Sequence, residues 1–353
     1  MIAELSKQGY ALLKENKIEQ AYYSFKSILD IVDNNNYALV GLGDLERKKH
    51  NHDKAVEYYS HCLKYYPTNN YALFGLADCY KALRQFQKAI EIWEKYLLQD
   101  DKNITVLTRV ADAYRKIHDF KKSKELYLRV LDMEEENAYA FIGLGHLHYD
   151  FKEYKDALYY WSRMLDIDKD VVDIRVLTSI GNCHRKLKSY DKGVYYFESA
   201  LKQDPKNFYA LFGLADCYRG KDEHEQSIEY WHKILELDPR NKVILTRTGD
   251  AYRAIGDYTK ALDYYNNALD IEYDVYAVLG LALISKEQGN FDEAIVSLNR
   301  LMQADPKNYR LYIYLAECYI ETKQKALAIN VLNSFKKTGL RNTAINDMIE
   351  RIA

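Results

Sequence analysis

Acidic and basic side chains recur in pairs along the sequence, three residues apart. Their chemistry is ionic: carboxylates accept hydrogen bonds, and guanidinium or ammonium groups donate them. The pairs are Asp44 with Arg47, Asp78 with Lys81, Asp112 with Arg115, Asp216 with Arg219 and Asp250 with Arg253. In one further segment Asn182 and Arg185 occupy the two positions, and in another His146 occupies the position of the acid. Residues three apart share a helix face. The pairs therefore predict either solvated ion pairs within each helix or a surface that offers alternating acceptors and donors to a bound polypeptide.

Motifs for catalysis or cofactor binding do not occur in the sequence. It contains no GxxxxGK[ST] or GxGxxG motif, which argues against a phosphate-binding loop. His146 and His148 are two residues apart, a spacing that places them on different helix faces rather than around one metal ion. An acidic run at 166–173 lacks the glycine and the glutamate of a calcium loop, because Val171 and Leu177 stand at those places. We expect no enzyme, no cofactor and no metal.

Composition and charge exclude further classes. The 353 residues are 48% hydrophobic and 29% charged, with a formal net charge of −2, which disfavours nucleic acid as a partner. The sequence has no apolar run of about 18 residues, the length that would predict a membrane span. Its first residues lack the pattern of a signal peptide. Five cysteines without CxxC spacing predict buried thiols in a reducing compartment. We expect a cytoplasmic protein, although a processed or truncated chain would show the same pattern.

A period near 34 residues runs through the chain. Trp93, Trp161 and Trp231 lie 68 and 70 residues apart, and Pro205 and Pro239 lie 34 apart. The period divides residues 2–342 into ten units, which start near residues 2, 36, 70, 104, 138, 174, 208, 242, 275 and 309. Because residues 170–173 add two residues before the sixth unit, we expect an irregular joint there.

Two positions of the unit keep one kind of side chain. Position 20 is always small: Ala21, Ala55, Ala89, Ser123, Ala157, Gly193, Ser227, Ala261, Ala294 and Ala328. Position 24 is always large and apolar: Phe25, Tyr59, Trp93, Tyr127, Trp161, Phe197, Trp231, Tyr265, Leu298 and Leu332. A small residue lets two helix backbones approach, and a large one a turn later fills the space beside it. Apolar residues at helical spacing predict two helices per unit, with Gly256 and Gly289 at the joints between them.

The pattern resembles the tetratricopeptide repeat family. The seventh unit shows it as Leu214, Ala215, Tyr218, Ser227, Trp231 and Pro239. The resemblance implies an all-α fold, an alpha-alpha superhelix of antiparallel helix pairs whose first helices line a concave groove for a protein or peptide partner. Residues 343–353 carry apolar side chains at helical spacing and are expected to form a C-terminal capping helix, or to begin an eleventh unit.

Units three to nine alternate between two types. One type has tyrosine at position 2 and glycine at position 6, as in Tyr71 and Gly75; the other has threonine at position 5, as in Thr108. A glycine within a helix costs about 1 kcal/mol relative to alanine. Either an aromatic ring of a neighbouring helix covers it, or it makes room for a bound chain. The residues expected to line the groove are Tyr71, Phe74, Asp78, Lys81, Thr108, Arg109, Asp112, Arg115, His146, Asn182, Arg185, Tyr209, Phe212, Asp216, Arg219, Thr246, Arg247, Asp250 and Arg253.

Three functions fit this sequence. The first is an interaction scaffold that binds a protein segment in the groove. The second is the repeat region of a larger enzyme, such as a glycosyltransferase. The third is a structural component of a bacterial assembly, which would use its edges and convex faces.

Overall fold

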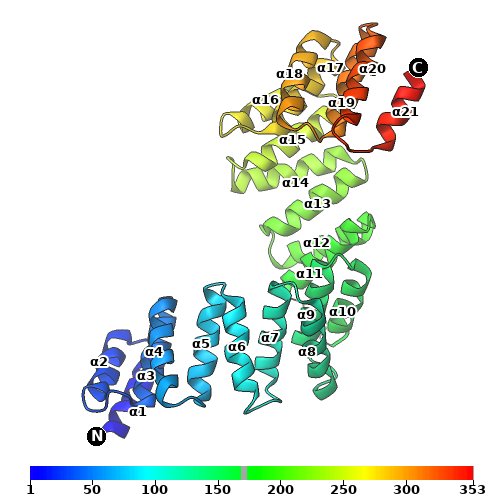
Figure 1. Cartoon of the computed structure of the whole chain (residues 1–353). Coiled ribbons are helices and arrows are strands. Elements are labelled where there is room, and N and C mark those ends of the chain that lie inside the picture. The colour runs from blue at the N-terminus through cyan, green and yellow to red at the C-terminus, as the bar shows by residue number, and fades with distance from the viewer. Residues whose placement is uncertain (168–172, 353) are drawn as a thin grey trace. The chain divides into compact units, whose positions relative to one another are not determined.

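Two compact units make up the chain in the computed structural model, which describes residues 1–167 and 173–352 (Figure 1). The secondary structure of these residues is entirely α-helical, so the predicted all-α fold is confirmed. Within each unit, consecutive helices pack as antiparallel pairs. The irregular joint expected at residues 170–173 falls almost wholly outside the described residues.

The described residues of the N-terminal unit form five helix pairs. Their helices are α1 (Ile2–Lys14), α2 (Ile18–Leu29), α3 (Asn36–Lys48), α4 (His52–Tyr65), α5 (Asn70–Ala82), α6 (Phe86–Leu97), α7 (Ile104–Lys116), α8 (Phe120–Met133), α9 (Ala138–Asp150) and α10 (Tyr154–Ile167). We call the odd-numbered members of these pairs the first helices and their partners the second helices.

The C-terminal unit contains five more pairs and one further helix. Its helices are α11 (Ile174–Lys186), α12 (Tyr190–Gln203), α13 (Phe208–Gly220), α14 (His224–Leu237), α15 (Lys242–Ala254), α16 (Tyr258–Leu269), α17 (Val275–Glu287), α18 (Phe291–Ala304), α19 (Tyr309–Glu321), α20 (Lys325–Lys336) and α21 (Thr343–Ile352). The last helix packs against α19 and α20 and buries Ile345.

Local sequence signals set the ends of the helices. Asparagine precedes most first helices, and its side chain accepts a hydrogen bond from the backbone N–H three residues on, as Asn69 does from Ala72 at 2.9 Å. Such a cap contributes about 1 kcal/mol to helix stability. Gly256 and Gly289 lie in the joints between paired helices, as predicted, and have φ angles of +82° and +81° there.

The core follows the two constant positions of the repeat. The small residues at position 20 are fully buried, and so are the large ones at position 24, including Trp93, Trp161 and Trp231. Each large side chain thus fills the space where two helix pairs meet. All five cysteines are buried free thiols in the described residues, as expected.

The first helices lie on the inner side of each unit. Consecutive first helices touch one another, as α1 does α3, α3 does α5, α11 does α13 and α15 does α17, whereas no consecutive second helices in the described residues make comparable contact. Because one row of helices is packed more closely than the other, each unit curves with its first helices on the concave face.

Candidate protein-binding surface on the first helices

A ladder of ion pairs crosses the first helices of the N-terminal unit. Arg47 on α3 donates to Asp44 of its own helix at 3.1 Å and to Asp78 of α5 at 3.2 Å. Arg109 on α7 reaches back to Asp78 at 2.5 Å. Asp78 therefore joins three consecutive first helices.

The ladder continues toward α9. Lys81 on α5 lies 3.3 Å from Asp112 on α7, which also accepts from Arg115 at 2.7 Å. Arg115 in turn pairs with Asp150 on α9. Burial raises the pKa of Asp112, but the hydrogen bond and charge of Arg115 and the charge of Lys81 outweigh it, and the pKa lies below its usual value.

The C-terminal unit repeats the arrangement. Asp216 on α13 accepts from Arg219 of its own helix at 2.6 Å and from Arg185 on α11, which also donates to Asn182 at 3.0 Å. Asp216 is only 7% exposed. Further pairs are Arg253 on α15 with Glu287 on α17, and Lys286 on α17 with Glu317 on α19.

The predicted ion pairs within single helices form at Asp44, Asp112 and Asp216, but an interpretation limited to single helices is incomplete. The spacing of three residues does put each pair on one helix face, but the same charges also bind the next first helix, about 31 residues away. Sequence spacing could not reveal these bonds, because they depend on how one helix pair stacks on the next. Most donors and acceptors of the surface are thus used within the protein.

The helical glycines are covered by aromatic rings. A Cβ atom on Gly75 would lie 2.4 Å from the ring of Tyr59, and one on Gly213 would lie 2.2 Å from the ring of Phe197. Gly143 and Gly280 meet Tyr127 and Tyr265 in the same way. The hypothesis that these glycines make room for a bound chain is wrong, because a buried ring from the preceding second helix fills that space.

The threonines and phenylalanines of the predicted groove also contact their own protein. Thr108 donates to the carbonyl of Ile104 at 2.9 Å, and Thr246 lies buried 3.4 Å from Asp274. The guanidinium of Arg109 lies over the ring of Phe74, at 4.9 Å from the ring centre. Phe212 packs edge-on against Trp231, at 5.1 Å between ring centres, and Arg247 is half-buried, with its charge acting on Asp216 and Asp250.

His146 and Asp250 are partly buried members of the same surface. Burial, and after it the charge of Arg115, lowers the pKa of His146 to about 4, so the ring is neutral near pH 7. Its ring centre lies 5.3 Å from that of Trp161. Burial raises the pKa of Asp250, whose carboxylate accepts a hydrogen bond from Tyr265 at 2.8 Å.

Exposed tyrosines stand at the start of alternate first helices. Tyr71 is 79% exposed and Tyr209 is 68% exposed, while Tyr139 and Tyr276 occupy the same position of other repeats with 76% and 68% exposure. Tyr37 on α3, which the sequence analysis did not select, is also 60% exposed. Among the large apolar side chains of the described first helices, these five rings are the most exposed.

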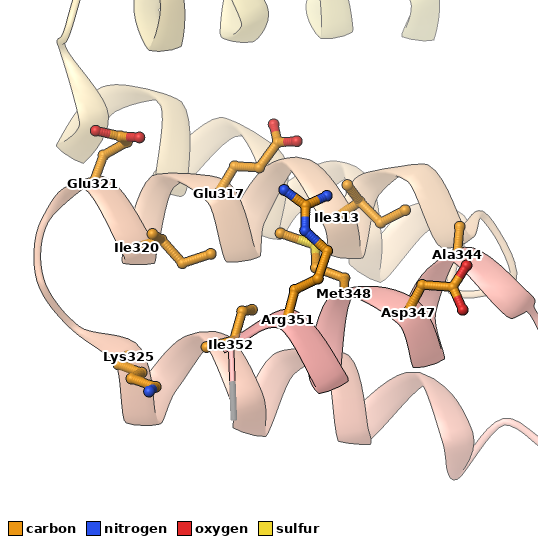
Figure 2. Close-up of a pocket in the computed structure, with 10 residues that line it drawn as sticks. All are labelled: Ile313, Glu317, Ile320, Glu321, Lys325, Ala344, Asp347, Met348, Arg351 and Ile352. Carbon is orange, nitrogen blue, oxygen red and sulfur yellow. The ribbon is translucent and has the colours of Figure 1, made fainter.

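A hollow lies on each unit, near the N-terminus in the first and near the C-terminus in the second. The hollow at the N-terminal end has a volume of about 810 Å³ and is lined by α1, α3 and α5, including Tyr10, Tyr37, Asp44 and Tyr71. The one at the C-terminal end has a volume of about 710 Å³ and lies between α19 and α21. Figure 2 shows its lining residues, which are Ile313, Glu317, Ile320, Glu321, Lys325, Ala344, Asp347, Met348, Arg351 and Ile352.

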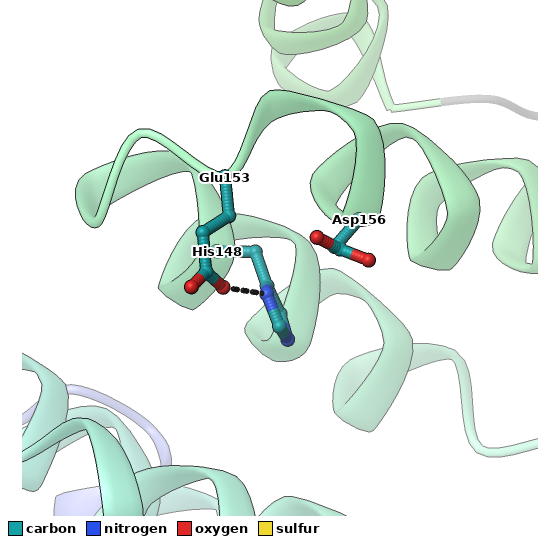
Figure 3. Close-up of side chains that lie close together, drawn as sticks. All are labelled: His148, Glu153 and Asp156. Carbon is teal, nitrogen blue, oxygen red and sulfur yellow. Dashed lines mark hydrogen bonds and ion pairs between the residues drawn. The ribbon is translucent and has the colours of Figure 1, made fainter.

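Within the described residues, one cluster of possible metal ligands lies away from these hollows. His148, Glu153 and Asp156 offer ligand atoms within 4.8 Å of one another, and Nδ1 of His148 is 2.6 Å from Oε2 of Glu153 (Figure 3). This grouping was not predicted from the sequence. Nε2 of His148 is buried without a hydrogen-bond partner, whereas a metal-binding histidine usually donates its second N–H to a neighbour. Stacking on Tyr160 at 5.1 Å indicates that His148 serves packing.

No helix in the described residues is long and apolar enough to span a membrane.

Comparison with known proteins points to one family. A tetratricopeptide repeat model matches residues 46–111 and 286–346, and a second one matches residues 109–170, 180–242, 220–277 and 246–308. No curated protein matches the sequence.

Similar solved structures include repeat proteins of the same kind. A tetratricopeptide repeat protein from Parabacteroides merdae is 14% identical over 70% of this chain and 98% of its own, with a TM-score of 0.54. A MamA protein is 24% identical over 48% of this chain and 92% of its own, with a TM-score of 0.43. Yeast Tom70 is 15% identical over 99% of this chain and 95% of its own, with a TM-score of 0.44.

The family models match most of the sequence, and the first of these structures shares the fold. Stacked helix pairs of this kind provide an extended surface for protein partners in general. The chain belongs to the tetratricopeptide repeat family.

Proposed function

We propose that the chain is a non-catalytic scaffold that binds a segment of a partner protein along the concave face of its first helices. The row of exposed tyrosines supports this proposal most directly. Tyr71 and Tyr139 in the N-terminal unit, and Tyr209 and Tyr276 in the C-terminal unit, each leave more than two thirds of the side chain open. Tyrosine is enriched at protein interfaces because its ring is large and rigid and its hydroxyl is polar.

The ion-pair ladder explains why the tyrosines, and not the charges, should make the main contacts. Asp78, Asp112 and Asp216 each accept from two basic side chains of the protein itself. A ligand that used these carboxylates would have to displace an existing bond. The tyrosine rings have no such competition, and burying them under a ligand removes apolar surface from water.

The spacing of the tyrosines sets the form of the ligand. Tyr71 and Tyr139 are 68 residues apart, the length of two repeats, and Tyr209 and Tyr276 have nearly the same separation. A repeat without such a tyrosine lies between the members of each pair. A bound segment should therefore present an apolar side chain about once every two repeats, as an extended or helical peptide can do through spaced pockets.

The test compares two pairs of tyrosines. The partner is captured from a lysate with the wild-type chain, identified by mass spectrometry and produced pure, and its affinity is then measured for two double variants. Tyr71→Ala with Tyr139→Ala removes rings from the first helices, and the matched control, Tyr159→Ala with Tyr195→Ala, removes rings of 59% and 65% exposure from the second helices. We expect the first variant to bind at least about tenfold more weakly, as two lost interface contacts require, and the control to bind as the wild type does.

The control also tests a second candidate function. Tyr23, Tyr159 and Tyr195 are exposed on second helices and favour a structural role in which the outer face contacts other subunits. Loss of binding in the Tyr159→Ala and Tyr195→Ala variant alone would support that role and refute binding on the concave face.

A further inference from the structure

The ladder follows a rule that relates each acid to the helix before it. Asp78 accepts from Arg47, Asp112 from Lys81 and Asp216 from Arg185, and in each case the base lies 31 residues earlier on the preceding first helix. The preceding helix thus supplies one cation to each of these carboxylates.

Asp44 lacks a cation from the preceding first helix. The residue 31 positions before it is Leu13 on α1, whose side chain carries no charge. Within the described residues, the ion pair of Asp44 is the one with Arg47, and Arg47 is shared with Asp78. Burial raises the pKa of Asp44, although the hydrogen bond from Tyr59 and the charge of Arg47 oppose the rise. The carboxylate is therefore short of positive charge compared with Asp112 and Asp216.

The hollow at the N-terminal end lies where the missing cation would come from. Tyr10 of α1, Tyr37 of α3 and Tyr71 of α5 line it together with Asp44. The Tyr10 hydroxyl donates to the backbone carbonyl of Tyr37 at 3.0 Å, which ties the Tyr10 side chain to the start of α3. Three aromatic side chains from successive first helices thus surround the approach to one under-compensated carboxylate.

The protein itself shows how a cation fits such surroundings. The guanidinium of Arg109 lies 4.9 Å from the ring centre of Phe74 and donates to Asp78 at 2.5 Å. A positive charge is attracted to the face of an aromatic ring and to a carboxylate at the same time. The hollow likewise combines a carboxylate, Asp44, with aromatic rings, while the internal cation of Asp44, Arg47, is shared with Asp78.

We infer that this hollow binds a basic side chain, lysine or arginine, of the partner segment. The inference rests on the proposed function and names the chemistry of one ligand position. The cation would take the place on Asp44 that the preceding helix fills on Asp78, with its aliphatic stem against the tyrosine rings. The formal net charge of −2 is compatible with a basic partner.

Lys7 on α1 is the alternative occupant of the hollow. Lys7 also lines the hollow, and a change of its side-chain rotamer could bring its ammonium group toward Asp44. In that case the protein would supply its own cation, and the hollow would not select for basic ligands.

The probe is a phage-displayed library of random peptides, selected on the whole 353-residue chain. We expect the enriched peptides to share a lysine or arginine, and a synthetic peptide with that residue changed to glutamine to bind about tenfold more weakly. The variant Asp44→Asn, which keeps an oxygen to accept from Tyr59, should bind the basic peptide about tenfold more weakly and the glutamine peptide unchanged.

A second variant protects the test against misfolding. Tyr37→Leu changes a side chain that is 60% exposed, and loss of one cation–π contact should weaken the basic peptide about two- to fivefold. The matched control Tyr139→Leu lies in the same unit outside the hollow and should leave the preference for a basic over a glutamine peptide unchanged.

The outcomes separate the two proposals. Peptides whose binding is insensitive to both Tyr71→Ala and Tyr139→Ala would refute the concave binding surface itself. Peptides that depend on these tyrosines but show no basic residue and no response to Asp44→Asn would overturn only the inference of a cation site. A preference for basic peptides that appears only in Lys7→Ala would show that Lys7 fills the hollow, and would overturn it as well.

Discussion

Replacing Gly213 by alanine places a methyl group where the ring of Phe197 already lies. The new Cβ atom would be 2.2 Å from the ring, and on another side the same ring is only 2.8 Å from the Cβ position of Gly181. The ring is fully buried and has little room to move. Overpacking of this kind costs about 1–3 kcal/mol, and the short distance puts Gly213→Ala near the upper end. Better helix propensity returns about 1 kcal/mol. We therefore expect the free energy of unfolding to fall by about 2 kcal/mol.

Urea unfolding followed by circular dichroism measures this change. The midpoint should move to lower urea with an unchanged slope. The control is a double-mutant cycle with Phe197→Leu, because the smaller side chain gives the new methyl group space. The double variant should be at least about 1 kcal/mol more stable than the sum of the two single changes predicts. If Gly213→Ala leaves the stability unchanged or raises it, the ring does not occupy that space, and the account of the glycines as packing positions is refuted.

Three further predictions concern buried ionisable groups. Burial, and after it the charge of Arg115, lowers the pKa of His146 from an ordinary 6.5 to about 4. The stability that this histidine contributes is therefore lost as the pH falls from 6.5 to about 4. An NMR titration of its ring should have a midpoint near 4, and a midpoint near 6.5 would contradict this. Burial raises the pKa of Asp216, but the hydrogen bond and charge of Arg219 outweigh it, and the pKa is lowered. The contribution of Asp216 to the free energy of unfolding is therefore present above the ordinary pKa of 3.8 and is lost as the pH falls through the pKa of the folded protein. Asp216→Asn should therefore lower the free energy of unfolding at pH 7 by about 3 kcal/mol and flatten its decline in acid; equal curves for variant and wild type would refute this. Burial raises the pKa of all five thiols, so Ellman's reagent should label them only after denaturation, and rapid labelling of the native chain would contradict their burial.

The helices and their core positions could be predicted from the sequence because the relevant contacts are local or periodic. Ala89 and Trp93 are four residues apart, and the same small and large pair returns in every unit. Such a pattern specifies which helix face is buried without any knowledge of the neighbouring repeat. The positive φ at Gly256 was predictable for the same reason, since it ends a local pattern.

The chemistry of the surface was harder to predict because it depends on contacts between repeats. Nothing local shows that Arg47 reaches Asp78 or that the ring of Tyr59 covers Gly75. One signal was present: tyrosine or phenylalanine at position 24 precedes glycine at position 6 of the next unit, whereas Trp93 precedes Arg109. Read across the boundary of two repeats, this correlation indicates packing.

Charge reversal on the ladder is for this reason a poor test of ligand binding. Asp112 accepts from Lys81 and Arg115, so Asp112→Arg would place three positive charges together and disturb the stacking of α5, α7 and α9. A loss of binding in that variant could come from the fold. The exposed tyrosines avoid this problem because their rings are open to solvent.

Site-specific photo-crosslinking tests the central claim most directly. A benzophenone amino acid is placed at Tyr71 on a first helix or at Tyr159 on a second helix, both exposed in the N-terminal unit. The variants of the 353-residue chain are irradiated in the presence of the captured partner. The account predicts a covalent adduct from position 71 and none from position 159. An adduct from position 159 alone would contradict binding on the concave face of the first helices.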